Sequence, residues 1–152
     1  MSDEPLREGM VDVSERGESD RRAVAEGLLV ADPETLEAIR RNDLPKPDPL
    51  ETARAAALLA IKDTPRLVPH CHPIRLTGAE IHFELSRDTV RLRCEVRVMD
   101  RTGPPMEALQ GVTTALLTLY DMIKALCPSA HVENVRVLEK TGGRSGHWQA
   151  ED

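Results

Sequence analysis

The sequence predicts an α+β fold in which helices cover one face of an antiparallel sheet. Three observations lead to this class. Residues 79–85 and 90–98 alternate apolar and polar side chains with a period of two, as strands with one buried face do. Helix-start signals stand at residues 32–33, 48–51 and 104–105. The predicted order of strands, two helices, a hairpin, a long helix and a last strand is typical of α+β proteins.

Length and composition predict one domain spanning residues 1–152, with flexible ends at 1–9 and 147–152. A net charge of −6 and only three aromatic residues argue against nucleic-acid binding. The longest apolar run, 55–61, is far shorter than the roughly 20 residues of a membrane-spanning helix. The N-terminus has no signal-peptide pattern, and three cysteines without a CxxC pair predict reduced thiols in a cytoplasmic protein.

The strands are predicted from periodicity and from residues that weaken helices. Residues 10–14 suggest a short strand. Residues 19–31 have no clean period, and Gly27 favours a strand there because glycine destabilises helix interiors. The segments on either side of 86–89 form a hairpin, whose charged side chains are expected on the solvent face. Residues 132–138 predict a last strand, followed by a glycine-rich loop.

The first two helices are predicted from their starts. Asp32, followed by proline, caps a helix that runs to about Arg41. Asp48 and Glu51 resemble a capping box that opens an alanine-rich helix. That helix is expected to reach Lys62 and to end at 63–65, which contains a proline.

The third helix is predicted to begin at 104–105 and to end before Pro128. Asp121 and Lys124 lie three residues apart, so they share a face of this helix. They predict either a surface ion pair or an acid/base pair in which partial desolvation lowers the pKa of the lysine. Helical spacing predicts a core stripe made of Leu109, Thr113, Leu116, Leu117, Tyr120 and Ile123.

Three further segments carry side chains suited to chemistry. His70, Cys71 and His72 suggest either a metal site or a pocket-lining loop, although neighbours in an extended chain point in opposite directions. Glu107 lies in a predicted first helical turn, where the helix dipole favours a carboxylate. Lys140 precedes the glycine-rich 142–146, where backbone amides can converge on an anion or simply form a tail.

In order along the chain, these segments resemble the cyclic pyranopterin monophosphate synthase family of molybdenum cofactor biosynthesis. Each piece is weak alone, and the ordered set is specific and covers about residues 10–146. The matching pieces are Met10–Ser14, Thr52–Arg54, Leu67–Pro73, Met106–Leu109, Ala115–Lys124 and Lys140–Gly146.

The resemblance implies a ferredoxin-like subunit in a homohexamer, a trimer of dimers with sites at subunit interfaces. It implies a lyase that converts 3′,8-cyclo-7,8-dihydroguanosine triphosphate to cyclic pyranopterin monophosphate and diphosphate, with no cofactor and no bound metal. The catalytic positions fall on Asp121, Lys124 and Lys46. The substrate-binding positions fall on His70, Cys71, His72, Met106, Glu107, Arg21, Lys140 and Arg144.

Two other functions stay open, and one of them follows from a departure from the family pattern. Pro105 stands where the family usually has a carboxylate. The same fold without that carboxylate is compatible with a non-catalytic module that binds a phosphate or a pterin. A metal-binding domain built on residues 70–72 is a third hypothesis. Conversion of substrate and metal analysis, respectively, discriminate these hypotheses from the enzyme.

Overall fold

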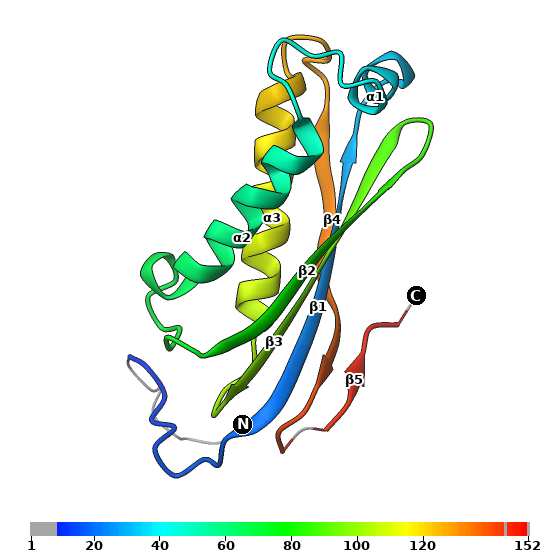
Figure 1. The fold of residues 1–152 in the computed structure, drawn as a ribbon. Coiled ribbons are helices and arrows are strands. Elements are labelled where there is room, and N and C mark those ends of the chain that lie inside the picture. The colour runs from blue at the N-terminus through cyan, green and yellow to red at the C-terminus, as the bar shows by residue number, and fades with distance from the viewer. Residues whose placement is uncertain (1–8, 145, 152) are drawn as a thin grey trace.

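A single five-stranded antiparallel sheet forms the base of the molecule (Figure 1). The computed structural model describes residues 9–144 and 146–151. The strands are ordered β2-β3-β1-β4-β5 across the sheet, and every neighbouring pair is antiparallel. Their bounds are β1 Ser19–Val30, β2 Leu76–Leu85, β3 Thr89–Asp100, β4 His131–Thr141 and β5 Trp148–Gln149.

The two long helices lie on one face of this sheet (Figure 1), which confirms the predicted α+β class and agrees with a ferredoxin-like arrangement. Helix α2, Pro49–Leu67, packs along α3, Pro105–Ile123, and α3 covers the central strands. The short helix α1, Pro33–Arg40, lies beyond one end of the sheet. None of these described helices is long and apolar enough to span a membrane.

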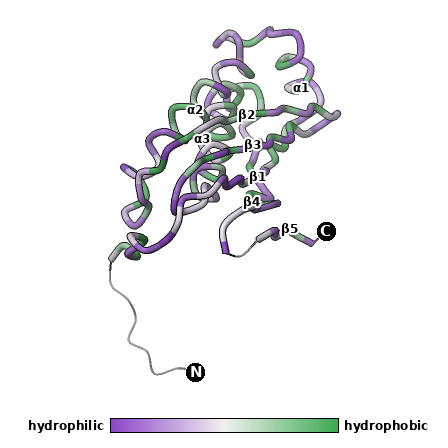
Figure 2. Tube along the Cα trace, turned by 60° about the horizontal axis from the view of Figure 1, so that its bottom comes forward, coloured by the Kyte–Doolittle hydropathy of each residue, from purple (hydrophilic) through white to green (hydrophobic). Residues whose placement is uncertain are grey.

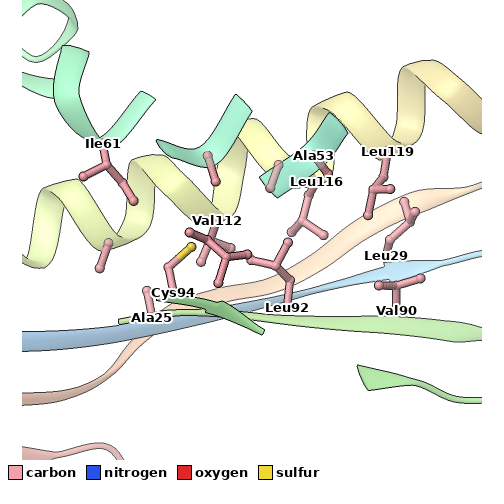
Figure 3. Packing of buried hydrophobic residues seen from close by; sticks show 14 of the residues in the cluster. Ala25, Leu29, Ala53, Ile61, Val90, Leu92, Cys94, Val112, Leu116 and Leu119 are labelled. Carbon is pink, nitrogen blue, oxygen red and sulfur yellow. The ribbon is translucent and has the colours of Figure 1, made fainter. Parts of the chain in front are cut away.

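The hydrophobic core lies between the helices and the sheet. Figure 3 shows Val112, Leu116 and Leu119 of α3 pointing toward side chains of the central strands, including Leu29 and Leu92. All five of these side chains are buried. Their burial fixes α3 against β1 and β3, so the ends of α3 have defined positions relative to the strand ends.

The outer face of the sheet is charged, as the alternation in the hairpin predicts. Glu26 of β1 is only 6% exposed and binds two arginines, Arg91 and Arg136. Glu95 binds Arg22 and Arg97 on the same face. These ion pairs lower the pKa of both glutamates, against the opposing effect of burial. Figure 2 shows hydrophilic and hydrophobic stretches mixed along the elements, as expected when each buries only one face.

The predicted cap of α1 is confirmed, whereas the capping box of α2 is wrong. Asp32 Oδ1 accepts a hydrogen bond from the Thr35 amide at 2.8 Å. Asp48 makes no side-chain cap and has a left-handed backbone, with φ of 54°. Its carboxylate instead accepts a bond from Asn42 Nδ2 at 2.9 Å, and its amide donates to Asn42 Oδ1 at 2.7 Å. The side chain of Asp48 therefore closes the preceding loop and leaves the helix start uncapped.

Helix α2 continues past the predicted end at 63–65 and includes Pro65. Proline removes one helical hydrogen bond, but here it stands in the last turn, where that loss is small. Thr64 Oγ1 donates to the Ala60 carbonyl, and the Val68 amide donates to the Thr64 carbonyl, so the turn around the proline stays closed.

The core stripe of α3 is rotated from the predicted one. Thr113 and Leu117 face solvent, and Leu117 is 65% exposed. Leu116 and Ile123 are buried as predicted, while Leu109 and Tyr120 lie at the margin of the core. Small residues let the helix lie close to the sheet, and the buried face consists of Ala108, Gly111, Val112, Ala115, Leu116, Leu119, Met122 and Ile123.

One prediction near the N-terminus is wrong, and near the C-terminus the structure has a strand that the sequence did not predict. Residues 10–14 form no strand, because Asp12 Oδ1 accepts a bond from the Ser14 amide and closes a turn instead. Residues 148–149, expected within a flexible tail, form β5 against β4, and the Ala150 amide donates to the Leu138 carbonyl. The predicted flexibility of residues 1–8 and 152 concerns positions outside the described residues.

Candidate functional site

A lysine–aspartate cluster, Lys46, Asp121 and Lys124, lies at the C-terminal end of α3. Lys46 Nζ donates to Asp121 Oδ2 and Lys124 Nζ donates to Asp121 Oδ1, each at 2.7 Å. Lys124 lies beside Asp121 because the two residues are three apart at the end of α3, whereas Lys46 reaches Asp121 from the loop that joins α1 to α2. Because all three side chains are about half exposed, the cluster is open to an incoming ligand.

The two lysines lower the pKa of Asp121 to about 2, mainly through their hydrogen bonds. The carboxylate in turn raises the pKa of Lys124. Of the two alternatives that the sequence leaves open, the structure shows the surface ion pair: Lys124 is 55% exposed and paired with an anion, so the desolvation that would lower its pKa is absent. At neutral pH the cluster carries two ammonium groups and one carboxylate.

A second group of predicted site residues, called the second cluster, lies at the opposite end of α3 and consists of Cys71, His72, Met106 and Glu107. Within it, the Cys71 thiol is near enough to the Glu107 carboxylate to be affected by its charge. Glu107 is 3% exposed, and burial raises its pKa to about 7. Burial and the nearby Glu107 carboxylate also raise the pKa of the Cys71 thiol. His72 Nε2 lies 2.7 Å from the Val11 carbonyl oxygen, while Met106 is 40% exposed at the first turn of the helix. The neighbouring His70 is exposed on the same loop.

An anion cleft opens beside this second cluster, with a volume of about 560 Å³. It lies between the loop before β1 and the loop after β4 and is lined by Arg16, Gly17, Glu18, Ser19, Arg21, Gly143 and Arg144. Three arginines against one glutamate favour an anionic ligand. Within the described residues, the buried Ser19 hydroxyl oxygen has no hydrogen-bond partner.

The glycine at position 143, which lines this cleft, is required by the local structure. Gly143 has φ of 72°, a left-handed conformation that side-chain-bearing residues rarely adopt. A Cβ atom at Gly143 would lie 2.0 Å from Arg21 Nη1 and would displace the guanidinium group. The Arg21 Nε also donates to the Asp100 carbonyl at 3.1 Å. The backbone of the loop and the end of β3 therefore hold Arg21 in place.

Lys140 is the one predicted cation of this segment that does not line the cleft. It lies on β4, and its ammonium group stands 5.6 Å from the centre of the Trp148 ring on β5. The β5 strand, which the sequence analysis missed, thus gives Lys140 a cation–π partner.

The predicted site residues therefore divide into two groups at the two ends of α3. From Met106 to Asp121 the helix advances by about 22 Å at 1.5 Å per residue. The loop of residues 68–75 and the anion cleft belong to the N-terminal end, and the lysine–aspartate cluster belongs to the C-terminal end (Figure 1). One chain does not gather Arg21, Lys46, Lys124 and Arg144 in a single pocket.

Sequence reasoning missed two residues of the cleft, Arg16 and Ser19. Arg16 lies in a polar loop without periodicity and Ser19 is the first residue of β1, and they join the cleft only because this part of the chain meets the loop after β4. No local pattern signals such a meeting. Within residues 9–144 and 146–151, no three His, Cys, Asp or Glu side chains are grouped so as to hold a metal ion together.

The fold and the two clusters define a class: a small α+β protein with an arginine-lined cleft for an anionic ligand and groups able to exchange protons. Comparison with known proteins makes the class more specific. Residues 10–143 match the model of the MoaC family. The chain belongs to this family, and both clusters and the cleft lie within or directly beside the matched residues.

Named relatives are similar to this chain over most of its length. A Corynebacterium efficiens protein named cyclic pyranopterin monophosphate synthase is 46% identical over 139 residues, covering 91% of this chain and 90% of the relative. The protein of the same name from Desulfitobacterium hafniense is 43% identical and covers 99% and 93%. Cyclic pyranopterin monophosphate synthase 2 of Mycobacterium bovis is 45% identical and covers 91% and 83%.

Proposed function

We propose that this chain is a cyclic pyranopterin monophosphate synthase of molybdenum cofactor biosynthesis. It converts 3′,8-cyclo-7,8-dihydroguanosine triphosphate to cyclic pyranopterin monophosphate and diphosphate. Family membership and the names of the relatives support this reaction. The observation that carries the proposal is the pair of 2.7 Å bonds that bring Lys46 and Lys124 onto Asp121. We expect the enzyme to act in the cytoplasm and without a cofactor.

The anion cleft is suited to the phosphates of this substrate. A cyclic monophosphate forms when a hydroxyl group attacks the α-phosphate and diphosphate leaves, so negative charge on the leaving group must be stabilised. Arg21 and Arg144 lie where they can neutralise that charge, and arginine binds phosphate oxygens through two parallel hydrogen bonds. Lys140 adds a further cation on the adjoining strand.

The two clusters are suited to the proton transfers of ring opening and ring closure. Asp121 stays ionised at neutral pH, so its role is to orient the ammonium groups of Lys46 and Lys124. Those two groups bear the protons and stabilise developing negative charge. Glu107, with a pKa of about 7, is the carboxyl group that can both take up and release a proton near neutrality.

The separation of the two ends favours an assembly in which subunits share sites. We infer a homohexamer built as a trimer of dimers, in which each site takes the N-terminal end of α3 from one subunit and the C-terminal end from another. One chain alone leaves about 22 Å of helix between the two groups. Light scattering on the purified protein tests the assembly, which should have about six times the subunit mass of 16.8 kDa.

Turnover of synthetic substrate tests the reaction. Wild-type protein should form cyclic pyranopterin monophosphate, and Asp121→Asn should form almost none while retaining its oligomeric mass. The alternative, a non-catalytic phosphate- or pterin-binding module, is favoured by one feature, Pro105 in the first turn of α3. Binding of substrate without any turnover in wild type would support that alternative.

A further inference from the structure

Trp148 is the only tryptophan of the chain, and it lies on the short strand β5 beside Lys140. The Lys140 ammonium group stands 5.6 Å from the centre of the indole ring. This distance lies within the roughly 6 Å over which an aromatic ring attracts a cation, and tryptophan is the strongest aromatic partner. Trp148 is 45% exposed and does not belong to the hydrophobic core of the described residues, so core packing does not account for it.

The register of the sheet places Lys140 on the same face as Arg21 of the anion cleft. Lys140 pairs with Trp148 on β5 and with Ala23 on β1, and Ala23 is buried in the core under the helices. Side chains two residues apart on a strand share a face, so Arg21 also lies on this helix-covered face. Arg21 and Lys140 are therefore diagonal neighbours on adjacent strands, with Cα atoms roughly 7–8 Å apart. The long side chain of Lys140 can reach an anion that Arg21 holds in the cleft.

The indole ring attracts the ammonium group of Lys140 without cancelling its charge. Within residues 9–144 and 146–151, Lys140 forms no ion pair, whereas both lysines of the lysine–aspartate cluster are paired with a carboxylate. The neighbouring Glu139 lies on the other face of the sheet, where its carboxylate binds Arg22 at 3.1 Å. The positive charge of Lys140 therefore remains for an anionic ligand.

Strand β5 belongs to the same hairpin as the loop that lines the anion cleft (Figure 1). The Ala150 amide donates to the Leu138 carbonyl at 2.8 Å, which extends the pairing of the two strands beyond Trp148. The connection between β4 and β5 contains Gly143 and Arg144, and both line the cleft. The hairpin that carries Arg144 into the cleft thus also places the Trp148 ring beside the cation of β4.

We propose that Trp148 is a positioning residue, whose ring holds the Lys140 ammonium group ready to bind the diphosphate end of the triphosphate substrate. The inference rests on the proposed function for the phosphate-binding role of Lys140. A lysine side chain without a partner samples many rotamers, and only those that point toward the phosphates can bind them. Restricting the side chain before the ligand arrives raises the competent fraction, and the apparent affinity rises by the same factor.

Two replacements of Trp148 separate the effect of the ring from that of an apolar side chain on β5. Trp148→Phe keeps a weaker aromatic face, whereas Trp148→Leu has none. In calorimetric titrations with inorganic diphosphate, Trp148→Leu should bind about two- to fivefold more weakly than wild type, the value of one exposed cation–π contact, and Trp148→Phe should lose less. With substrate, Trp148→Leu should raise KM by a similar factor and leave kcat nearly unchanged. Wild-type affinity in Trp148→Leu, or equal losses in the two variants, would overturn the proposal.

A double-mutant cycle tests whether the ring acts through Lys140. In a Lys140→Ala background, adding Trp148→Leu should not weaken diphosphate binding further, because the group that the ring positions is already absent. In a Lys62→Ala background, which removes an exposed lysine of α2, the full two- to fivefold effect should remain. An effect of Trp148→Leu that is the same in both backgrounds contradicts a role through Lys140.

The emission of the single tryptophan reports on this contact without any turnover. Saturating diphosphate should change the fluorescence of wild type and of Lys62→Ala, and should change that of Lys140→Ala much less. No change in wild type, or an equal change in Lys140→Ala, argues against the contact. A response that depends on Lys140 in a protein that forms no product would sink the proposed function and leave the positioning role standing. Normal turnover, with wild-type diphosphate affinity in Trp148→Leu, would do the reverse.

Discussion

Asp121 forms ion pairs with two lysines, Lys46 and Lys124, at an exposed position where such pairs contribute little to the free energy of folding. All three side chains are about half exposed, and exposed pairs of this kind contribute little to stability because water and salt screen them. Because these ion pairs add little to the free energy of folding, the catalytic role proposed for the cluster does not compete with a structural one. Folding and activity should therefore respond separately when the cluster is changed.

The first prediction concerns this cluster. Asp121→Asn and Lys124→Ala should each reduce product formation by roughly 10²–10⁴-fold, because a positioned acid/base group contributes about that much and Lys124 depends on Asp121 for its position. Their thermal midpoints should stay close to wild type. The matched control is Asp63→Asn, which breaks a surface pair with Arg66 at the same three-residue spacing on α2. Turnover within twofold of the control for either variant would refute the assignment.

The second prediction concerns Glu107 and pH. Its pKa in the folded protein is about 7 against an ordinary 4.5, so the folded state holds the proton more tightly than the unfolded state. The resulting stability is present at low pH and is lost as pH rises from 4.5 through 7, by about 3 kcal/mol in total. Glu107→Gln, which has no proton to lose, should gain stability relative to wild type over that interval.

Thermal unfolding of both proteins between pH 5 and pH 8, at one fixed protein concentration, measures this difference. Glu34→Gln, at an exposed position in the first turn of α1, provides the control and should track wild type at every pH. Parallel curves for wild type and Glu107→Gln would show that the carboxyl group titrates normally.

The third prediction concerns the anion cleft. Arg144→Ala should weaken binding of the triphosphate substrate roughly ten- to a hundredfold, the value of one charge-assisted contact to phosphate. Binding of the monophosphate product should weaken less, because it lacks the diphosphate group. Calorimetric titration with substrate, product and diphosphate measures this, with Arg87→Ala in the exposed β2–β3 turn as the control. Equal affinities of Arg144→Ala and wild type would place the phosphates elsewhere.

Whether the position of a single site residue could be predicted depends on how far away in the sequence its contact partner lies. The proximity of Asp121 and Lys124 follows from helical spacing, and the structure confirms it. Lys46 reaches Asp121 across 75 positions of sequence, and only the family resemblance suggested a shared role. Spacing alone could not decide between a surface ion pair and a desolvated acid/base pair, because it gives no information about the exposure of Lys124.

At the scale of elements, sequence patterns correctly predicted the strands and helices whose formation depends mainly on neighbouring residues. Period-two alternation located the β2–β3 hairpin, since each strand buries one face against the helices. The predicted core stripe of α3 was rotated about the helix axis from the observed one, because Ala108 and Val112 face the core in place of Thr113 and Leu117. A stripe chosen by hydrophobicity prefers leucine to alanine at core positions, whereas the close packing of α3 on the sheet favours small side chains there.

The close approach of β1 to α3 yields the fourth prediction. A Cβ atom at Gly27 would lie 2.6 Å from Leu116 Cδ1 and 2.8 Å from Val112 Cγ1. Gly27→Ala should therefore destabilise the protein by about 1–3 kcal/mol, the usual cost of overpacking a core. Gly78→Ala in β2 is the control, because no atom lies within 4 Å of its Cβ position. Equal unfolding midpoints for the two variants would contradict this packing.

At the scale of the whole molecule, the residues proposed for the site lie in two groups, one at each end of α3. The fold class followed from the order of elements in the sequence. The separation of the proposed site residues into two groups did not follow from the sequence, because it depends on how α3 is oriented relative to the loops that it meets. The placement of β5 against β4 likewise depends on a long-range strand pairing.

The central claim, that this chain makes cyclic pyranopterin monophosphate, is tested most directly by one assay. Purified wild-type protein is incubated with 3′,8-cyclo-7,8-dihydroguanosine triphosphate, and the pterin product and diphosphate are both quantified over time. The account predicts that the two form in equal amounts, and that Asp121→Asn forms neither above background. Wild-type protein that binds the substrate but releases no diphosphate would contradict it.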